Sequence, residues 1–179
     1  KESGIDVIVT DHHRISNQLP DALAIINPRR HDCPSNSSYF AGVGVAFCLI
    51  IGLRRHLRKI NFWDLQTQPK LKEYCDLVAL GTISDIVPMI KENRVITRSG
   101  IDVINSNPRP GIKALLGASG IMKPHIDSDD IAFRIGPRIN ASGRMAHAEL
   151  GVELLLTKDS GRAAQLAEKL NSLNTMRQK

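Results

Sequence analysis

The chain has 179 residues, of which 42% are hydrophobic and 23% charged, enough for one sizeable globular domain or for one domain and the start of another. Its net charge of +6 fits a polyanionic partner, and with 4% aromatic residues any contact to nucleic acid rests more on charge than on stacking. Three scattered cysteines suggest neither a disulfide framework nor a zinc site and favour a cytoplasmic setting. The longest apolar run is too short for a membrane span of about 20 residues.

Two short strands are predicted first. Residues 5–10 form an extended, β-branched stretch typical of a buried parallel strand, and residues 24–28 form a second strand that Pro28 closes. Residues 29–39 are polar and predict a loop. The almost entirely apolar run that follows predicts a helix over residues 42–59, buried between layers.

Helices dominate the rest of the chain. Apolar residues at helical spacing predict one helix from Leu71 towards Pro88, which limits its extension, and others over residues 93–105, 112–116, 127–133 and 151–156. Asp127 or Ser128 is expected to cap the helix over residues 127–133. Asp159 or Ser160 caps a final helix, which we expect to project from the body. Strands alternating with helices indicate an α/β layered architecture: the C-terminal part of a parallel sheet flanked by helices, followed by a mostly helical segment.

The first candidate site is the triplet Asp11, His12 and His13 at the end of the first strand. Ligands gather at the carboxyl edge of parallel sheets, and a carboxylate often orients a metal-binding imidazole. Strand alternation predicts that the two histidines point to opposite sides. The alternative is that the triplet simply ends a strand and caps the next turn.

A second candidate is Asp85, which stands in the apolar stretch 83–89. A buried carboxylate is costly unless it is paired or bound to a metal ion. The alternative is a helix-terminal cap exposed at a turn.

The segment GPRINASGRM, residues 136–145, is the third candidate. Its small residues allow close approach of the backbone, and the guanidinium groups of Arg138 and Arg144 match phosphate oxygens. Asn140 and Ser142 add further hydrogen-bonding groups. The alternative is an ordinary surface loop with solvated arginines.

Four segments together carry a resemblance to a known family. VTDHH (residues 9–13), AGVGVAF (41–47), LGTISDIVP (80–88) and GPRINASGRM (136–145) resemble, in this order and spacing, the RecJ family of the DHH phosphoesterase superfamily. LNSLNTMR at residues 170–177 is similar to the start of the long connecting helix of that family. The resemblance covers essentially the whole chain.

The resemblance implies a 5′→3′ exonuclease that hydrolyses single-stranded DNA in repair and recombination with two Mn²⁺ or Mg²⁺ ions. His12 and Asp85 would bind metal, while His13 and Asp11 would serve catalysis near the scissile phosphate. Arg138, Asn140, Ser142 and Arg144 would hold the DNA backbone. A single-strand-binding protein and a recombination helicase are implied as partners, with no membrane involved.

The family's upstream aspartate motifs and its downstream DHH-associated and OB-fold domains are absent from these residues. We therefore expect an internal fragment: residues 1–156 from the C-terminal portion of the catalytic domain, and residues 157–179 from the start of the connecting helix. We expect the isolated fragment to be inactive. Ser142 and Met145 replace residues common in relatives.

Two alternatives remain at this point. The chain could come from another DHH phosphoesterase, acting on oligonucleotides, cyclic dinucleotides or pyrophosphate. It could also come from a non-catalytic DNA-binding scaffold that lost its metal ligands, although His12 and Asp85 are retained.

Overall fold

The computed structural model describes residues 4–16, 18–35, 37–63, 68–145 and 147–178, with the backbone alone for Arg144 and Met145. Strand β1 (Ile8–Thr10) pairs in parallel with β2 (Ala24–Ile26), with Ile8 opposite Ala24. The helical elements of the described residues are α1 (Gly42–Lys59), η1 (Leu71–Tyr74), α2 (Cys75–Ser84), α3 (Lys91–Ser106), α4 (Pro110–Ala118), α5 (Ser128–Asp130), η2 (Ile131–Ile135), α6 (Gly136–Met145), α7 (Glu149–Leu156) and α8 (Ser160–Gln178). The predicted α/β fold, with a parallel sheet followed by helices, is confirmed.

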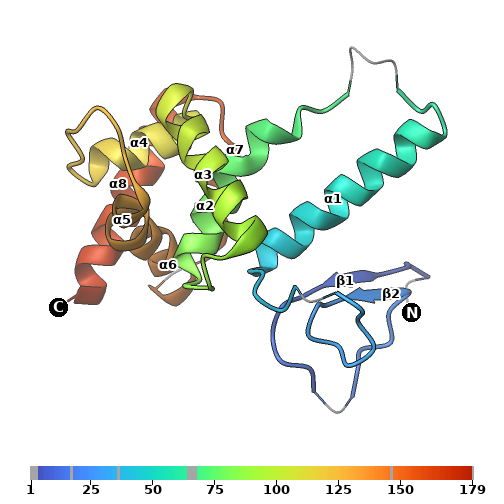
Figure 1. Cartoon of the computed structure of the whole chain (residues 1–179). Helices are drawn as coiled ribbons and strands as arrows, with labels where there is room; N and C mark the ends of the chain where they lie inside the picture. The colour runs from blue at the N-terminus through green and yellow to red at the C-terminus, as the bar shows by residue number, and fades with distance from the viewer. Residues whose placement is uncertain (1–3, 17, 36, 64–67, 146, 179) are drawn as a thin grey trace.

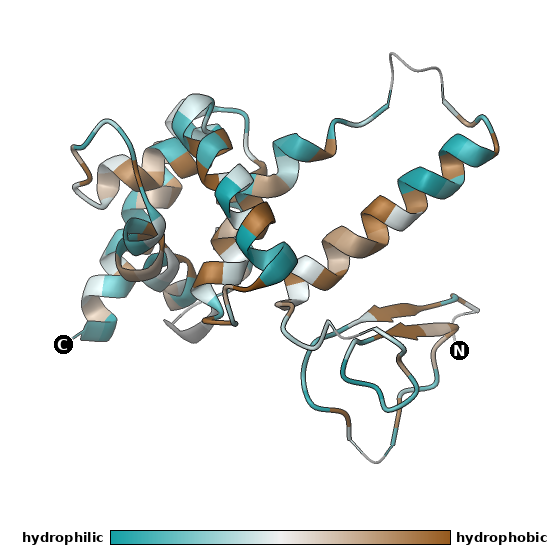
Figure 2. Ribbon diagram, viewed as in Figure 1, coloured by the Kyte–Doolittle hydropathy of each residue, from teal (hydrophilic) through white to brown (hydrophobic). Residues whose placement is uncertain are grey.

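The strands are less buried than their sequence predicts. Ile8 is 53% exposed, and Ile5 and Val7 are exposed as well. Figure 2 shows the apolar strands on the open side of the molecule, beneath α1. The prediction of a buried strand is wrong for this chain, because α1 packs against β1 but leaves Ile5, Val7 and Ile8 exposed to solvent.

Helix α1 has the predicted bounds but not the predicted burial. Gly44, Val45 and Phe47, near its start, are buried, whereas Ile50 and Leu53 are about half exposed. The helix leaves the body after its first turns (Figure 1). Apolar composition therefore did not imply burial on all sides.

The helical body has a closed core. The largest fully buried side chains there are Ile112, Leu115, Ile131, Ile135, Leu154 and Leu170. Helix α8 packs against α4, α6 and α7 and buries Ala163, Leu166 and Leu170. The prediction of a projecting last helix is wrong, because its apolar face lies against these helices of the same chain. No helix in the described part of the chain is long and apolar enough to span a membrane.

A buried ion pair joins three helices of the body. Arg109, at the N-cap of α4, donates from Nε and Nη2 to the two carboxylate oxygens of Asp76 at 2.5 and 2.9 Å. Arg109 also donates to the Leu155 carbonyl at the end of α7. Because the Asp76 side chain is only 2% exposed, the two hydrogen bonds from the Arg109 guanidinium group take the place of hydration at this carboxylate.

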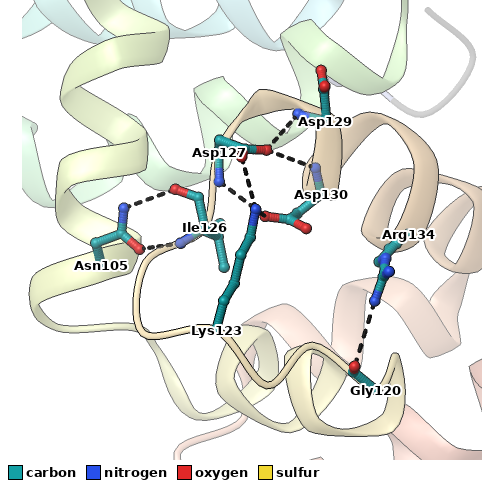
Figure 3. A network of polar contacts seen from close by, with 8 residues as sticks. All are labelled: Asn105, Gly120, Lys123, Ile126, Asp127, Asp129, Asp130 and Arg134. Carbon is teal, nitrogen blue, oxygen red and sulfur yellow. Dashed lines mark hydrogen bonds and ion pairs between the residues drawn. The ribbon is translucent and has the colours of Figure 1, made fainter.

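A polar network fixes the start of the unit α5–η2–α6 (Figure 3). Asp127 caps α5, as predicted, by accepting from the backbone N–H groups of Asp129 and Asp130. Lys123 pairs with Asp127 and Asp130 at 2.7 and 2.5 Å. Asn105 of α3 exchanges two hydrogen bonds with the backbone of Ile126. The network ties this unit, which carries the third candidate segment, to α3.

Candidate metal and phosphate site

A cavity of about 720 Å³ lies where the segment after β1 meets α1, α2 and α6. Its lining includes His12, Gly42, Ser84, Asp85, Asn140 and Gly143. Residues from all three candidate segments, separated by up to 131 positions from His12 to Gly143, therefore share one hollow.

His12 and Asp85 face one another in this cavity. His12 Nδ1 lies 3.5 Å from Asp85 Oδ2, which is longer than a good hydrogen bond, and this buried nitrogen has no hydrogen-bond partner. The His12 side chain is 15% exposed. A side chain at Gly42 would place its Cβ 3.3 Å from His12 Cδ2, so the glycine of the AGVG segment leaves room for the imidazole.

Asp85 occupies the C-cap position of α2, and its backbone N–H donates to the Gly81 carbonyl. An ionised carboxylate has no proton to donate to the free carbonyls at a helix C-terminus, so the capping alternative accounts for the position of Asp85 but not for its carboxylate. A negative charge at a helix C-terminus is unfavourable, because the helix dipole is negative there. A cation held between Asp85 and His12 would remove this repulsion and occupy the unpaired His12 nitrogen.

Asp11 orients His13 rather than His12. The ring Nδ1 of His13 lies 2.8 Å from Asp11 Oδ1, which also accepts the His13 backbone N–H at 3.2 Å. These bonds, chiefly the one to the ring, hold the pKa of Asp11 below its usual value. The turn predicted by the alternative reading is therefore present, and it leaves the His13 side chain exposed.

The two imidazoles do not point to opposite sides. The ring centroids of His12 and His13 lie 4.3 Å apart. The predicted alternation fails because β1 ends at Thr10, so neither histidine has strand geometry.

The third candidate segment is a helix, α6, so the surface-loop alternative is wrong. Asn140 is exposed at the cavity. Arg138 donates to Asn171 Oδ1 of α8 and to the Arg134 carbonyl, away from the cavity, and burial lowers its pKa. Ser142 is buried and donates to the Ile139 carbonyl. The Arg144 side chain lies outside the described residues.

Sequence reasoning missed two polar residues near the site. Buried Asn27 donates to Asp11 Oδ2 and to the His13 carbonyl at 3.2 and 3.0 Å, and so fixes the turn that carries both histidines. Ser84 lines the cavity, and its buried hydroxyl has no partner. The signal for Asn27 was an amide at the end of β2, since the ends of neighbouring parallel strands meet at one edge.

These residues fit part of a metal site. The unpaired imidazole nitrogen and the carboxylate are donors that suit Mn²⁺, and a carboxylate oxygen also suits Mg²⁺. Within the described residues no group of three or more His, Cys, Asp or Glu side chains gathers around a possible ion. His12 and Asp85 would therefore supply two ligands of such a site, which would need others as well.

Comparison with known proteins agrees with this geometry. Residues 1–82 match the family model described as "DHH family, N-terminal domain". The chain is 47% identical to the single-stranded-DNA-specific exonuclease RecJ of Salmonella typhimurium, covering 99% of this chain and 31% of that protein. It is 38% identical to RecJ of Bacillus subtilis, covering 100% of this chain and 21% of the relative. The chain thus spans less than a third of these relatives.

Solved structures show the same similarity in three dimensions. An exonuclease RecJ bound to manganese superposes with a TM-score of 0.81 at 36% identity, over 99% of this chain and 42% of that one. RecJ of Thermus thermophilus with Mg²⁺ gives a TM-score of 0.75 at 35% identity, over 98% of this chain and 25% of that one. Residues 1–82 are therefore similar to the DHH family, and the chain as a whole is similar to the RecJ exonucleases.

Proposed function

We propose that the protein containing this chain is a metal-dependent 5′→3′ exonuclease that hydrolyses single-stranded DNA in repair and recombination, and that this chain supplies part of its metal site. The observation that carries the proposal is the pair His12 and Asp85, 3.5 Å apart across a cavity, with the buried His12 nitrogen unpaired. The printed names of the relatives, which specify single-stranded DNA and manganese or magnesium, support it.

In this proposal His12 and Asp85 hold Mn²⁺ or Mg²⁺ as members of a larger ligand set. When bound, such ions activate water and stabilise the leaving oxygen. Asp11 fixes the ring of His13 through Nδ1, which leaves the opposite ring nitrogen, Nε2, to contact the scissile phosphate. Asn27 stabilises this arrangement by donating hydrogen bonds to Asp11 and to the His13 carbonyl.

Helix α6 is proposed to carry the phosphate-binding residues. Asn140 reaches the cavity directly, and its amide can donate to a phosphate oxygen. Arg138 and Ser142 would act by holding the helix, because their donors are bound to Asn171, Arg134 and Ile139. Arg144 is proposed as a direct contact to the DNA backbone.

The test is hydrolysis by the full-length protein in Mn²⁺ of a substrate panel: single-stranded and duplex DNA, dinucleotides, cyclic dinucleotides and pyrophosphate. We expect single-stranded DNA to be preferred, and His12→Ala or Asp85→Ala to lower kcat by at least about 100-fold. His56→Ala, an exposed histidine on α1, is the matched control. Preference for dinucleotides or pyrophosphate would favour another DHH phosphoesterase, and binding without hydrolysis would favour a scaffold.

The isolated 179-residue chain is proposed to be inactive, since it offers two ligands to a site that needs more. A cytoplasmic location, and a single-strand-binding protein and a recombination helicase as partners, are proposed from the family resemblance. The proposed inactivity would be contradicted if the isolated chain showed manganese-dependent nuclease activity that His12→Ala abolishes.

A further inference from the structure

A second groove adjoins the candidate metal site. It has a volume of about 310 Å³ and lies between the end of α2, the unit η2–α6 and the end of α8. Ser84 and Asn140 line both the groove and the larger cavity, so the two hollows share a wall. A chain-like ligand whose phosphate lies near His12 and Asp85 could continue across this wall into the groove.

The groove combines an exposed apolar rim with a cation. Phe133 is 76% exposed and Ile86 is 90% exposed, although large apolar side chains gain by burial. Arg177 lies opposite on α8, where it donates to Asn174 Oδ1, and no carboxylate of the described residues pairs with it. An aromatic ring beside an unpaired guanidinium matches the two halves of a nucleotide, a base and a phosphate.

The backbone conformation around the groove is consistent with a ligand-binding role. Ile86 has φ = 56°, a left-handed conformation that is costly for a β-branched residue and that holds its side chain out at the rim. A Cβ at Gly136 would lie 2.6 Å from Ser84 Oγ, so this glycine leaves space for the serine at the shared wall. The Ser84 hydroxyl is buried without a partner there, and is free to donate to a ligand that crosses the wall.

We propose that this groove is a subsite for one nucleotide of single-stranded DNA, next to the phosphate held at the metal site. Phe133 stacks on the base, and Arg177 contacts the phosphate of the same or the following nucleotide. A base must be unpaired to stack on a side chain in this way, so the groove contributes to the choice of single strands over duplex. This inference rests on the proposed function and assigns a specificity element to it.

The test uses the full-length protein, with Mn²⁺, and a set of oligo-dT substrates of about 10 nucleotides in which one abasic position is moved along the strand. In the wild type, we expect one abasic position to raise KM by roughly 5- to 100-fold, the loss of a single stacked base. In Phe133→Ala, KM for the intact strand rises by a similar factor, and the same abasic position has no further effect. Phe133→Tyr retains the wild-type pattern.

Matched controls separate stacking from general damage. Phe62→Ala removes another exposed phenylalanine, 64% exposed against 76% for Phe133, and leaves KM unchanged. Phe62 follows the end of α1, which points away from the helical body in Figure 1. Arg177→Ala lowers the dependence of log KM on log salt by about 0.7, the loss of one phosphate contact on a single strand, whereas Arg55→Ala on α1 does not.

Each outcome of these experiments either supports or overturns the subsite. If the wild type does not degrade single-stranded DNA, the proposed function fails and this inference falls with it. If the wild type degrades the strand but no abasic position is coupled to Phe133, the subsite alone is overturned. The abasic scan can be carried out with the wild type alone, so an unstable Phe133→Ala protein would not prevent the test. A wild-type scan in which no abasic position raises KM already contradicts the subsite.

Discussion

The helical body and the N-terminal sheet differ in how completely they bury their apolar residues. In the body, Leu115, Leu154 and Leu170 have no exposed surface, while in the sheet Ile8 is half exposed. The body therefore has a core of its own, whereas β1 and β2 expose most of their apolar surface in this chain. Strong β propensity therefore marks residues that are suited to burial, but it does not supply the partner that buries them.

The candidate site lies across this boundary. His12 comes from the turn after β1, and Asp85 from the end of α2 in the body. The position of His12 relative to Asp85 therefore depends on the turn, which Asn27 holds by two hydrogen bonds and for which Gly42 leaves room. Substitutions in the two regions test the contrast between the closed body and the open sheet.

The largest expected effect is loss of the buried ion pair. Asp76→Ala should lower the free energy of unfolding of the 179-residue chain by about 3–5 kcal/mol, because it leaves Arg109 without its partner in a largely buried place. Urea denaturation followed by circular dichroism measures this value. Asp102→Ala, an exposed aspartate on α3, is the control. A loss no larger than that of the control would show that the body does not depend on this pair.

A pair of apolar truncations compares the two regions directly. Leu170→Ala should cost about 2–5 kcal/mol, because it opens a cavity in a closed core. Ile8→Ala should cost less than about 1.5 kcal/mol, because half of its surface is already in water. The same denaturation experiment measures both. Equal losses would remove the distinction drawn between body and sheet.

Asn27→Ala tests the attachment of the turn. In the full-length protein we expect the Mn²⁺ concentration for half-maximal nuclease activity to rise about 10- to 100-fold, as for other residues that orient metal ligands. The cause is the loss of two hydrogen bonds, to Asp11 and to the His13 carbonyl. Asn107→Ala, exposed at the end of α3, should leave this concentration unchanged. An unchanged value for both variants would mean that the turn holds its shape without Asn27.

The smallest effect concerns pH. Hydrogen bonds to Lys123 hold the pKa of Asp127 below its ordinary value of about 3.9 and raise that of Lys123 above about 10.4. The contact therefore stabilises the folded protein at pH values above the ordinary carboxyl pKa. This contribution is lost as the pH falls through the lowered pKa of Asp127. Lys123→Met should give a slightly lower melting temperature at pH 7, with no difference from the wild type well below pH 3.9. A difference that persists in acid would assign the effect to packing.

Much of the fold could be predicted from periodicity alone. The bounds of α1, the cap at Asp127 and the apolar face of α8 follow from local preferences, which depend on neighbouring residues. Burial could not be predicted in the same way. The exposure of β1 and the packing of α8 depend on which elements of the chain reach them, and local sequence carries no information on that.

The candidate site shows the same division. Residue types made His12, Asp85 and Asn140 candidates with open alternatives, and the family resemblance assigned their roles; one cavity does unite them. The tertiary structure decided that Arg138 and Ser142 hold a helix, that Asp11 orients His13, and that Phe133 and Arg177 share a groove. Hydrogen-bond partners and grooves arise between segments distant in the chain, so only the packing of those segments determines them.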